Sequence, residues 1–291
     1  MGGTNGNENF QLNVSGWEKI RKEKKDTLKD FLERAAEERI PSISIAPITG
    51  AVENIGMSNE KDYYGQIIQA ATEVGLGLCI GDGYPDEKLK FGLDALRKCT
   101  VGGMKAAIFI KPYPNEKIME RIGWSADCAS VIGIDIDSFN LATMRNLVHL
   151  EKKSAAQLLE IKSRLEELGL PFAIKGVFTE DDIETIRSVR PKIAYISNHG
   201  GRIDTRRGST AEFLAQNASE LGKYCEEIWI DGGIRTPLDV ATALSLGASR
   251  VLVGRPFITA MLKGGVGGLC QKVLELSLID YGKSVDSHTT A

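Results

Sequence analysis

The sequence lacks the features that mark several large classes of protein. No apolar run approaches the ~20 residues that a membrane-spanning helix needs. Residues 1–13 are polar and glycine-rich, without the apolar stretch of a secretory signal. The net charge of −3 provides no excess of positive charge for binding nucleic acid or an anionic membrane surface. We therefore expect a cytoplasmic protein whose partners include neither nucleic acid nor a membrane.

Cysteine is scarce, and its spacing provides neither a disulfide framework nor a metal site. The five cysteines are odd in number and scattered, and no two have the spacing of metal ligands. This pattern is typical of free thiols in a reducing compartment, and we expect no bound metal. The cysteines are Cys79, Cys99, Cys128, Cys225 and Cys270.

Short β-rich runs, in contrast, recur eight times along the chain. Most are continuously apolar, as expected of parallel strands that are covered by helices. Helical patterns lie between them, for example over 61–74 and 154–168. Thr179 has the place of a helix N-cap, and Gly169 that of a residue just past a helix end. The predicted strands are Ser42–Ala46, Gly77–Ile80, Ala106–Ile110, Val131–Asp135, Phe172–Lys175, Ile193–Ser197, Glu227–Asp231 and Arg250–Gly254.

Eight strand–helix units in 291 residues predict an α/β fold, the (β/α)8 TIM barrel. The competing fold is an open doubly wound sheet, but no GxGxxG turn follows the first strand. We expect an N-terminal extension at 1–40, helical from residue 14 and packed on the bottom or side of the barrel. The barrel itself would occupy 41–281, and a flexible tail 282–291.

The segment Ser197–Arg202 follows the sixth predicted strand, where a TIM barrel places active-site residues. His199 could move a proton near neutral pH. Arg202 could hold a carboxylate through two parallel hydrogen bonds, and the intervening glycines allow a ligand to approach the backbone. An ordinary loop could carry the same residues by chance, but charged residues and glycines follow the other strands as well.

The seventh and eighth strands precede a possible phosphate site. Asp231–Arg235 and Gly254–Arg255 each place a glycine and an arginine just before a helix. TIM barrels often bind phosphate with these two loops, through backbone N–H groups near a helix N-terminus. The alternative is a pair of ordinary turns with surface arginines. The position of both arginines in adjacent turns favours phosphate binding.

Charged residues end several other strands. Lys175 could stabilise negative charge that develops on a bound ligand, although a lysine at a strand end can also simply extend to solvent. The remaining four residues are as well explained by ion pairs on the rim as by ligand contacts. They are Asp82, Lys111, Asp135 and Asp137.

Together these motifs resemble the FMN-dependent α-hydroxy-acid oxidase and dehydrogenase family, which includes glycolate oxidase and lactate oxidase. The resemblance is strong over residues 171–258 and weaker at Ala46–Pro47 and over residues 81–96. It is carried by Ile174–Val177, Ser197–Arg202, Asp231–Arg235 with Asp239–Val240, and Ala243–Pro256.

The resemblance implies FMN as cofactor, a small carboxylate as substrate, an electron acceptor of unknown identity and a homo-oligomer. His199 would be the catalytic base and Arg202 the substrate-carboxylate clamp, while Lys175 would act at the N1 and O2 side of the flavin. The residues implied in cofactor binding are Ala46, Pro47, Asp82, Lys175, Asp231, Gly232, Gly233, Arg235, Gly254 and Arg255.

The chain departs from the family pattern around the substrate, as in a short, divergent bacterial-type branch. Residues 10–40 contain no tyrosine, although the family places a substrate-binding tyrosine there. Lys111 lies in the third strand's Phe-Ile-Lys-Pro segment, where the family has Gln-x-Tyr, and Gly133 replaces a threonine on the fourth strand. We therefore expect Lys111 to bind substrate, and the space beside Gly133 to admit a larger or additionally anionic hydroxy acid than glycolate or lactate.

Two other functions remain open at this point. A flavin-dependent isomerase of the type 2 isopentenyl-diphosphate isomerase kind would need a magnesium–diphosphate site, whereas Ser197–Arg202 favours a carboxylate substrate. A non-catalytic barrel that binds flavin or a phosphate ligand would explain the missing tyrosine and threonine. It would not explain why both His199 and Arg202 are present, because FMN binding alone needs neither.

Overall fold

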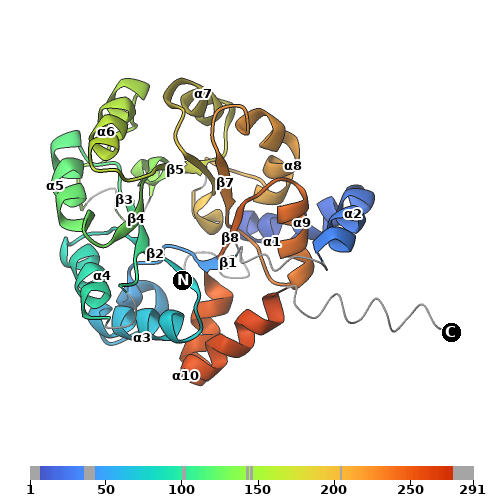
Figure 1. Cartoon of the computed structure of the whole chain (residues 1–291), viewed down its shortest axis with the longest axis horizontal. Helices are drawn as coiled ribbons and strands as arrows, with labels where there is room; N and C mark the ends of the chain where they lie inside the picture. The colour runs from blue at the N-terminus through green and yellow to red at the C-terminus, as the bar shows by residue number, and fades with distance from the viewer. Residues whose placement is uncertain are drawn as a thin grey trace.

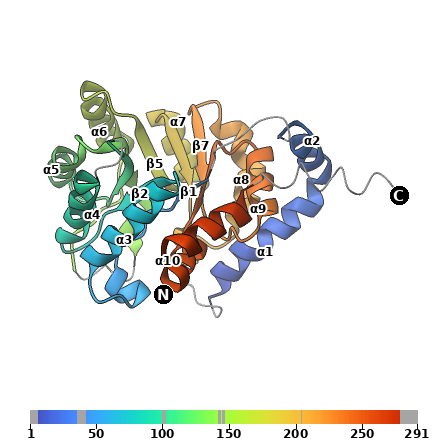
Figure 2. The same cartoon turned by 60° about the horizontal axis from the view of Figure 1, so that its bottom comes forward.

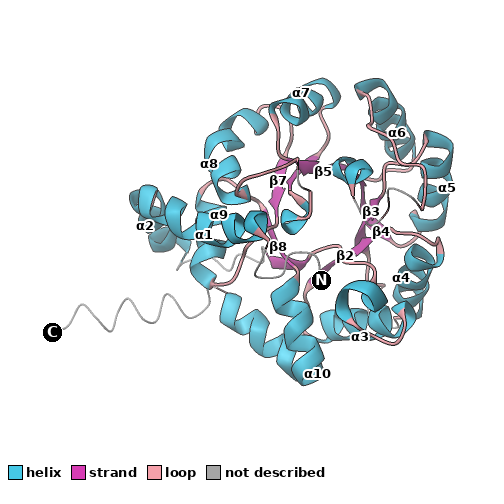
Figure 3. Cartoon of the chain, turned by 180° about the vertical axis from the view of Figure 1, so that it is seen from behind, coloured by secondary structure: helices cyan, strands magenta, loops and turns pink. Residues whose placement is uncertain are grey.

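A computed structural model describes residues 7–35, 43–99, 103–141, 144, 147–203 and 205–277. Within them, eight parallel strands pair in sequence order, and the last pairs with the first to close a barrel. Figure 1 shows the strands in the middle of the molecule, and Figure 3 shows helices surrounding them. The predicted TIM barrel is confirmed. The proposed tail at 282–291 lies outside the described residues.

The strands follow the predicted runs closely. The largest differences are at β4, which starts two residues early, and at β5, which continues two residues beyond Lys175. The register of β5 against β6 shifts between Lys175 and Val177, and Gly176 there has φ +95°. The strands are β1 Ile43–Ile45, β2 Gly77–Gly81, β3 Ala106–Ile110, β4 Ala129–Asp135, β5 Phe172–Val177, β6 Ile193–Ile196, β7 Glu227–Ile230 and β8 Arg250–Val253.

Two helix ends lie where the local sequence predicts them. Thr179 caps α7 in a reciprocal pair of hydrogen bonds with Asp182, and Gly169 after α6 has φ +66°. The helices are α1 Glu8–Glu23, α2 Lys25–Ala35, α3 Glu60–Glu73, α4 Glu87–Lys98, α5 Asn115–Ser125, α6 Ala155–Glu167, α7 Glu180–Val189, α8 Thr210–Leu221, α9 Pro237–Ser245 and α10 Arg255–Leu276. Short helical turns lie at η1 Ala51–Ile55, η2 Ile136–Asn140 and η3 His199–Gly201.

The inside of the barrel is a packed core rather than a pore. Phe109, Tyr195 and Trp229 meet edge to face there, with ring centroids 5.2 to 6.4 Å apart. Gly133 is required by this packing, because a Cβ at that position would lie 2.6 Å from the Phe109 ring. The expectation that Gly133 leaves space for substrate is therefore wrong, since Phe109 occupies that space.

The N-terminal helices differ from the sequence expectation. The first of them, α1, begins at Glu8 rather than near residue 14. It packs along the side of the barrel on α8 and α9, as Figure 2 shows, and its first turns contact η3 at the rim where the strands end. The expected place at the bottom or side of the barrel therefore leaves out the contact of α1 with the rim. None of the described helices is long and apolar enough to cross a membrane.

Candidate functional site

A cavity of about 480 Å³ opens at the carboxyl ends of the strands, within the range of roughly 300–1,000 Å³ that is usual for ligand sites. All of the predicted site residues line it, so the barrel brings together positions that are up to 209 residues apart (Ala46 to Arg255). These residues are Ala46, Pro47, Asp82, Lys111, Lys175, His199, Arg202, Asp231, Gly232, Gly233, Arg235, Gly254 and Arg255.

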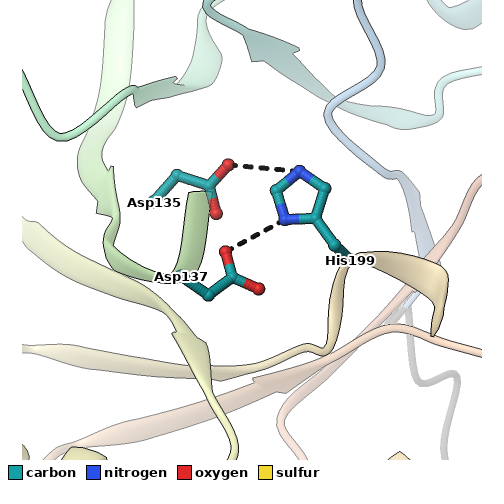
Figure 4. A group of neighbouring side chains, drawn as sticks. All are labelled: Asp135, Asp137 and His199. Carbon is teal, nitrogen blue, oxygen red and sulfur yellow. Dashed lines mark hydrogen bonds and ion pairs between the residues drawn. The ribbon is translucent and has the colours of Figure 1, made fainter. Parts of the chain in front are cut away.

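His199 lies in η3, directly beyond β6, in a conformation that few non-glycine residues adopt, with φ +58°. Its Nδ1 lies 2.9 Å from an Asp137 carboxylate oxygen, and its Nε2 lies 3.6 Å from Asp135 Oδ2 (Figure 4). The Nε2 atom also lies 3.4 Å from Lys111 Nζ. Because the Asp137 carboxylate can only accept, we assign the ring hydrogen to Nδ1. The Nε2 atom then carries a lone pair that can accept a proton.

The surroundings of His199 favour its neutral form. Burial, followed by the positive charge of Lys175, lowers the pKa of His199 below its usual 6.5, against the opposing effect of Asp135 and Asp137. A neutral imidazole whose Nδ1–H is held by a carboxylate has the form of a general base.

Asp135 at the end of β4 links two buried lysines. One oxygen lies 2.7 Å from Lys111 Nζ and the other 2.8 Å from Lys175 Nζ. Burial alone would raise the pKa of the Asp135 carboxyl, but the two ammonium groups outweigh burial and hold it well below its usual range. We call the group Lys111, Asp135, Asp137, Lys175 and His199 the lysine–aspartate cluster. Its formal charges cancel when His199 is neutral.

The carboxylates and imidazole of this cluster also have the spacing of metal ligands. One ligand atom each from Asp135, Asp137 and His199 lie within 4.8 Å of one another. However, each Asp135 oxygen already has a lysine partner, and these ammonium groups would repel a cation. The ion pairs account for the arrangement, and we assign no metal to it. The cluster therefore gives no support to the metal-dependent isomerase alternative.

Three arginines form a second charged group, the arginine cluster: Arg202, Arg235 and Arg255. Burial lowers the pKa of each. The pKa of Arg255 falls to about 10, because burial and the charges of Arg235 and Arg202 outweigh the opposing charge of Asp231. Arg202 makes no hydrogen bond or ion pair with another residue in the described part of the chain. These positive charges repel one another and favour an anion in the cavity.

Two other predicted residues, Asp231 and Asp82, form hydrogen bonds that hold the rim of the barrel. Asp231 accepts hydrogen bonds from Tyr195 Oη and Ser197 Oγ, each at 2.8 Å, and burial raises its pKa. Asp82 is fully buried and accepts from the backbone N–H of Gly83 and from Arg121 Nε. Both carboxylates therefore fix strand ends in place, in addition to lining the cavity.

Sequence reasoning missed several residues around the cavity. Leu141, Met144 and Leu147 form an apolar part of the lining beyond β4, and their spacing of three residues was a signal that could have found them. Arg121 is fully buried beside Asp82, and nothing local indicated that partner. Phe10 lies against Arg235 and Arg255, which only the docking of α1 explains.

Comparison with known proteins places the chain in a family. A family model described as FMN-dependent dehydrogenase matches residues 108–278. The 2-hydroxyacid oxidase 2 of Bos taurus is 38% identical over 117 residues, which is 40% of this chain and 32% of the relative. The 4-hydroxymandelate oxidase of Amycolatopsis orientalis is 29% identical over 196 residues, 64% of this chain and 54% of the relative. The chain thus spans about a third to a half of the length of these relatives.

Solved structures agree on the fold. A mandelate oxidase with benzoyl-formic acid superposes with a TM-score of 0.62 at 21% identity, covering 86% of this chain and 76% of that one. A mutant flavocytochrome b2 with pyruvate bound gives a TM-score of 0.59 at 20% identity, covering 84% and 65%. At this level of identity, the likeness concerns the barrel.

Proposed function

This chain belongs to the FMN-dependent dehydrogenase family, and on that premise we propose that it oxidises a 2-hydroxy acid to the 2-keto acid with FMN as cofactor. One observation carries the proposal: His199, held by Asp137, lines the same cavity as Arg202, which makes no hydrogen bond or ion pair with a described residue. A base beside an unpaired arginine suits a substrate that combines an acidic hydrogen with a carboxylate.

The cavity also suits FMN. The phosphate dianion would relieve the repulsion within the arginine cluster, and it would lie against Arg235 and Arg255. Gly232 and Gly233, with φ of +98° and +78°, line the cavity with their backbone. Lys175 would stand near the ring system and stabilise negative charge there. Bound FMN would supply the acceptor for the two electrons and the second hydrogen that leave the carbinol group.

The protein residues would divide the work on the substrate. Arg202 holds the carboxylate through its planar pair of donors. His199 Nε2 takes a proton from the carbinol group, and Asp137 stabilises the imidazolium that forms, because its oxygen lies 2.9 Å from Nδ1. Lys111 and Lys175 keep Asp135 ionised beside the His199 ring. The two ammonium groups thus lie in the same cluster as His199, and the carboxylates of the cluster balance their charge.

The lining favours a hydroxy acid with a bulky side chain. Leu141, Met144 and Leu147 present apolar surface to the cavity, and apolar contact there would contribute to binding. Lys111 remains a candidate substrate contact, but its pairing with Asp135 weakens the expectation of a second anionic group. Glycolate and L-lactate would leave the apolar surface uncovered, and we expect both to be poor substrates.

Anaerobic mixing of the flavin-loaded protein with a panel of 2-hydroxy acids tests this function. Loss of oxidised-flavin absorbance should be fastest with bulky, apolar hydroxy acids and slow with glycolate and L-lactate. Subsequent exposure to oxygen distinguishes an oxidase from a dehydrogenase by the rate of reoxidation. Absence of reduction by any hydroxy acid, with FMN bound, would favour the non-catalytic binding barrel instead.

A further inference from the structure

The N-terminal helix α1 is fastened to the rim of the barrel at the two loops that carry the candidate site. Asn13 donates to the Asn198 side chain, which precedes His199, and accepts from the backbone N–H of Thr210. Trp17 donates its indole N–H to the carbonyl of Gly232, which follows β7. Because Asn13 and Trp17 are fully buried, these contacts make α1 part of the rim structure.

The backbone of α1 approaches two glycines of the site motifs very closely. A Cβ at Gly233 would overlap the carbonyl oxygen of Asn13, and a Cβ at Gly201 would lie 2.7 Å from the backbone nitrogen of Phe10. The two glycines also have positive φ, +78° and +83°. Helix docking is therefore a reason for glycine at both positions.

This docking places the Phe10 ring against two members of the arginine cluster. The ring centroid lies 4.2 Å from the guanidinium carbon of Arg255 and 5.3 Å from that of Arg235, within the ~6 Å reach of a cation–π contact. Phe10 is only 8% exposed. A buried aromatic ring thus contacts two like charges that line one cavity.

Two neighbouring guanidinium groups would otherwise tend to separate. The Phe10 ring attracts both through its electron-rich π system, and the carbonyl of Gly200 accepts a hydrogen bond from Arg255 at 2.8 Å. These contacts hold the arginines in place before an anion binds, which lowers the cost of ordering them on binding.

We propose that Phe10 is a positioning residue for phosphate binding, holding Arg235 and Arg255 ready for the phosphate group of FMN. The N-terminal helix is then part of the cofactor site. This proposal rests on the proposed function, because it takes FMN as the ligand of the arginine cluster.

Flavin titration of the apoprotein tests the proposal, with Phe10→Leu compared to the wild type. Leucine keeps the apolar contact of the helix but removes the π system. The affinity for FMN should fall by about three- to thirty-fold, as expected from the loss of cation–π contacts. Riboflavin has the same ring and lacks the phosphate, so its affinity should stay unchanged. Phe10→Tyr, which keeps an aromatic ring, should retain most of the FMN affinity.

The outcomes separate this proposal from the proposed function. If the wild type binds FMN and Phe10→Leu binds it equally well, the role of Phe10 is wrong and the proposed function stands. Equal losses of FMN and riboflavin in Phe10→Leu would mean that the residue only supports the fold, which also overturns its role. A wild-type protein that binds neither flavin would overturn the proposed function and the role of Phe10 together.

Discussion

The lysine–aspartate cluster and the arginine cluster line the same cavity but differ in how their charges are balanced. In the first, the Asp135 oxygens pair with Lys111 and Lys175 at 2.7 and 2.8 Å, and an Asp137 oxygen holds His199. In the second, like charges lie near one another, and burial together with Arg235 and Arg202 outweighs Asp231 and lowers the pKa of Arg255 to about 10. A balanced cluster keeps its geometry without a ligand, whereas an unbalanced one is completed by an anion.

This difference indicates how the two clusters divide the chemistry. The lysine–aspartate cluster fixes the orientation and protonation of His199 before substrate binds, as proton transfer by a general base requires. The repulsion within the arginine cluster favours the binding of anions, here a phosphate and a substrate carboxylate. Substitutions in the first should therefore change catalysis and folding, and substitutions in the second should change ligand affinity.

Replacement of His199 should have the largest effect on the reaction. We expect His199→Ala to slow flavin reduction by ~10²–10⁴-fold, the usual contribution of a general base, and to leave FMN affinity nearly unchanged. Stopped-flow absorbance with the best substrate measures the first effect, and flavin titration the second. Reduction at the wild-type rate would mean that another group takes the proton.

Removal of the central charge of the balanced cluster should cost mainly stability. Asp135→Asn leaves two buried lysines without their carboxylate, and breaking such a pair typically costs about 3–5 kcal/mol. Urea unfolding of the apoprotein, followed by circular dichroism, measures this loss. As a matched control from the arginine cluster, Arg202→Leu should cost much less, because no described residue pairs with Arg202. Similar losses of unfolding free energy in both variants would contradict the difference in charge balance between the two clusters.

A conservative change at Arg202 should reduce substrate recognition while leaving the fold intact. Lysine offers a point charge in place of a planar pair of donors, and loss of one charge-assisted hydrogen bond costs roughly 1.5–3 kcal/mol. We therefore expect Arg202→Lys to lower kcat/KM by about one to two decades, with unchanged thermal stability. An unaltered kcat/KM would place the carboxylate clamp elsewhere, with Lys111 the first residue to test.

The pH dependence of kcat/KM and of stability should show the smallest effect, and it tests the charges around His199 in the lysine–aspartate cluster. The pKa of His199 is lowered in the folded protein, so kcat/KM should fall only as pH drops below the usual 6.5. The free energy of unfolding should also decrease as pH falls below 6.5, because His199 then binds more protons in the unfolded chain than in the folded protein. Rates and urea midpoints measured from pH 5 to 8 check both. An acid limb above 6.5 would mean that Asp135 and Asp137 outweigh burial and Lys175.

Most of the barrel could be predicted from the sequence, because its signals are local. Continuous apolar runs mark strands that are buried on both faces, and residues such as Thr179 and Gly169 mark helix ends through their own backbone preferences. The strand ends then locate the rim, because a closed parallel barrel places all of them on one side. This is why the predicted site residues all line one cavity.

The partners of these residues could not be predicted in the same way. The missing side chain of Gly133 suggested open space for substrate, but the Phe109 ring from the neighbouring strand fills that space. The substrate contact of Lys111 stays a prediction, but its ion pair with Asp135 on the next strand could not be predicted from the sequence. Both depend on the register between strands, and a shift of one residue would turn each side chain to the other face.

The sequence by itself determined the fold, the positions of the strand ends and the residue types that gather there, because hydrophobic pattern and helix capping act over a few neighbouring residues. Only the tertiary structure decided which charges are balanced and which are not. It also decided that Phe10, far from the motifs in sequence, lies against Arg235 and Arg255. Electrostatic balance depends on distances and burial between distant segments, and these exist only once the barrel has closed and α1 has docked on its rim.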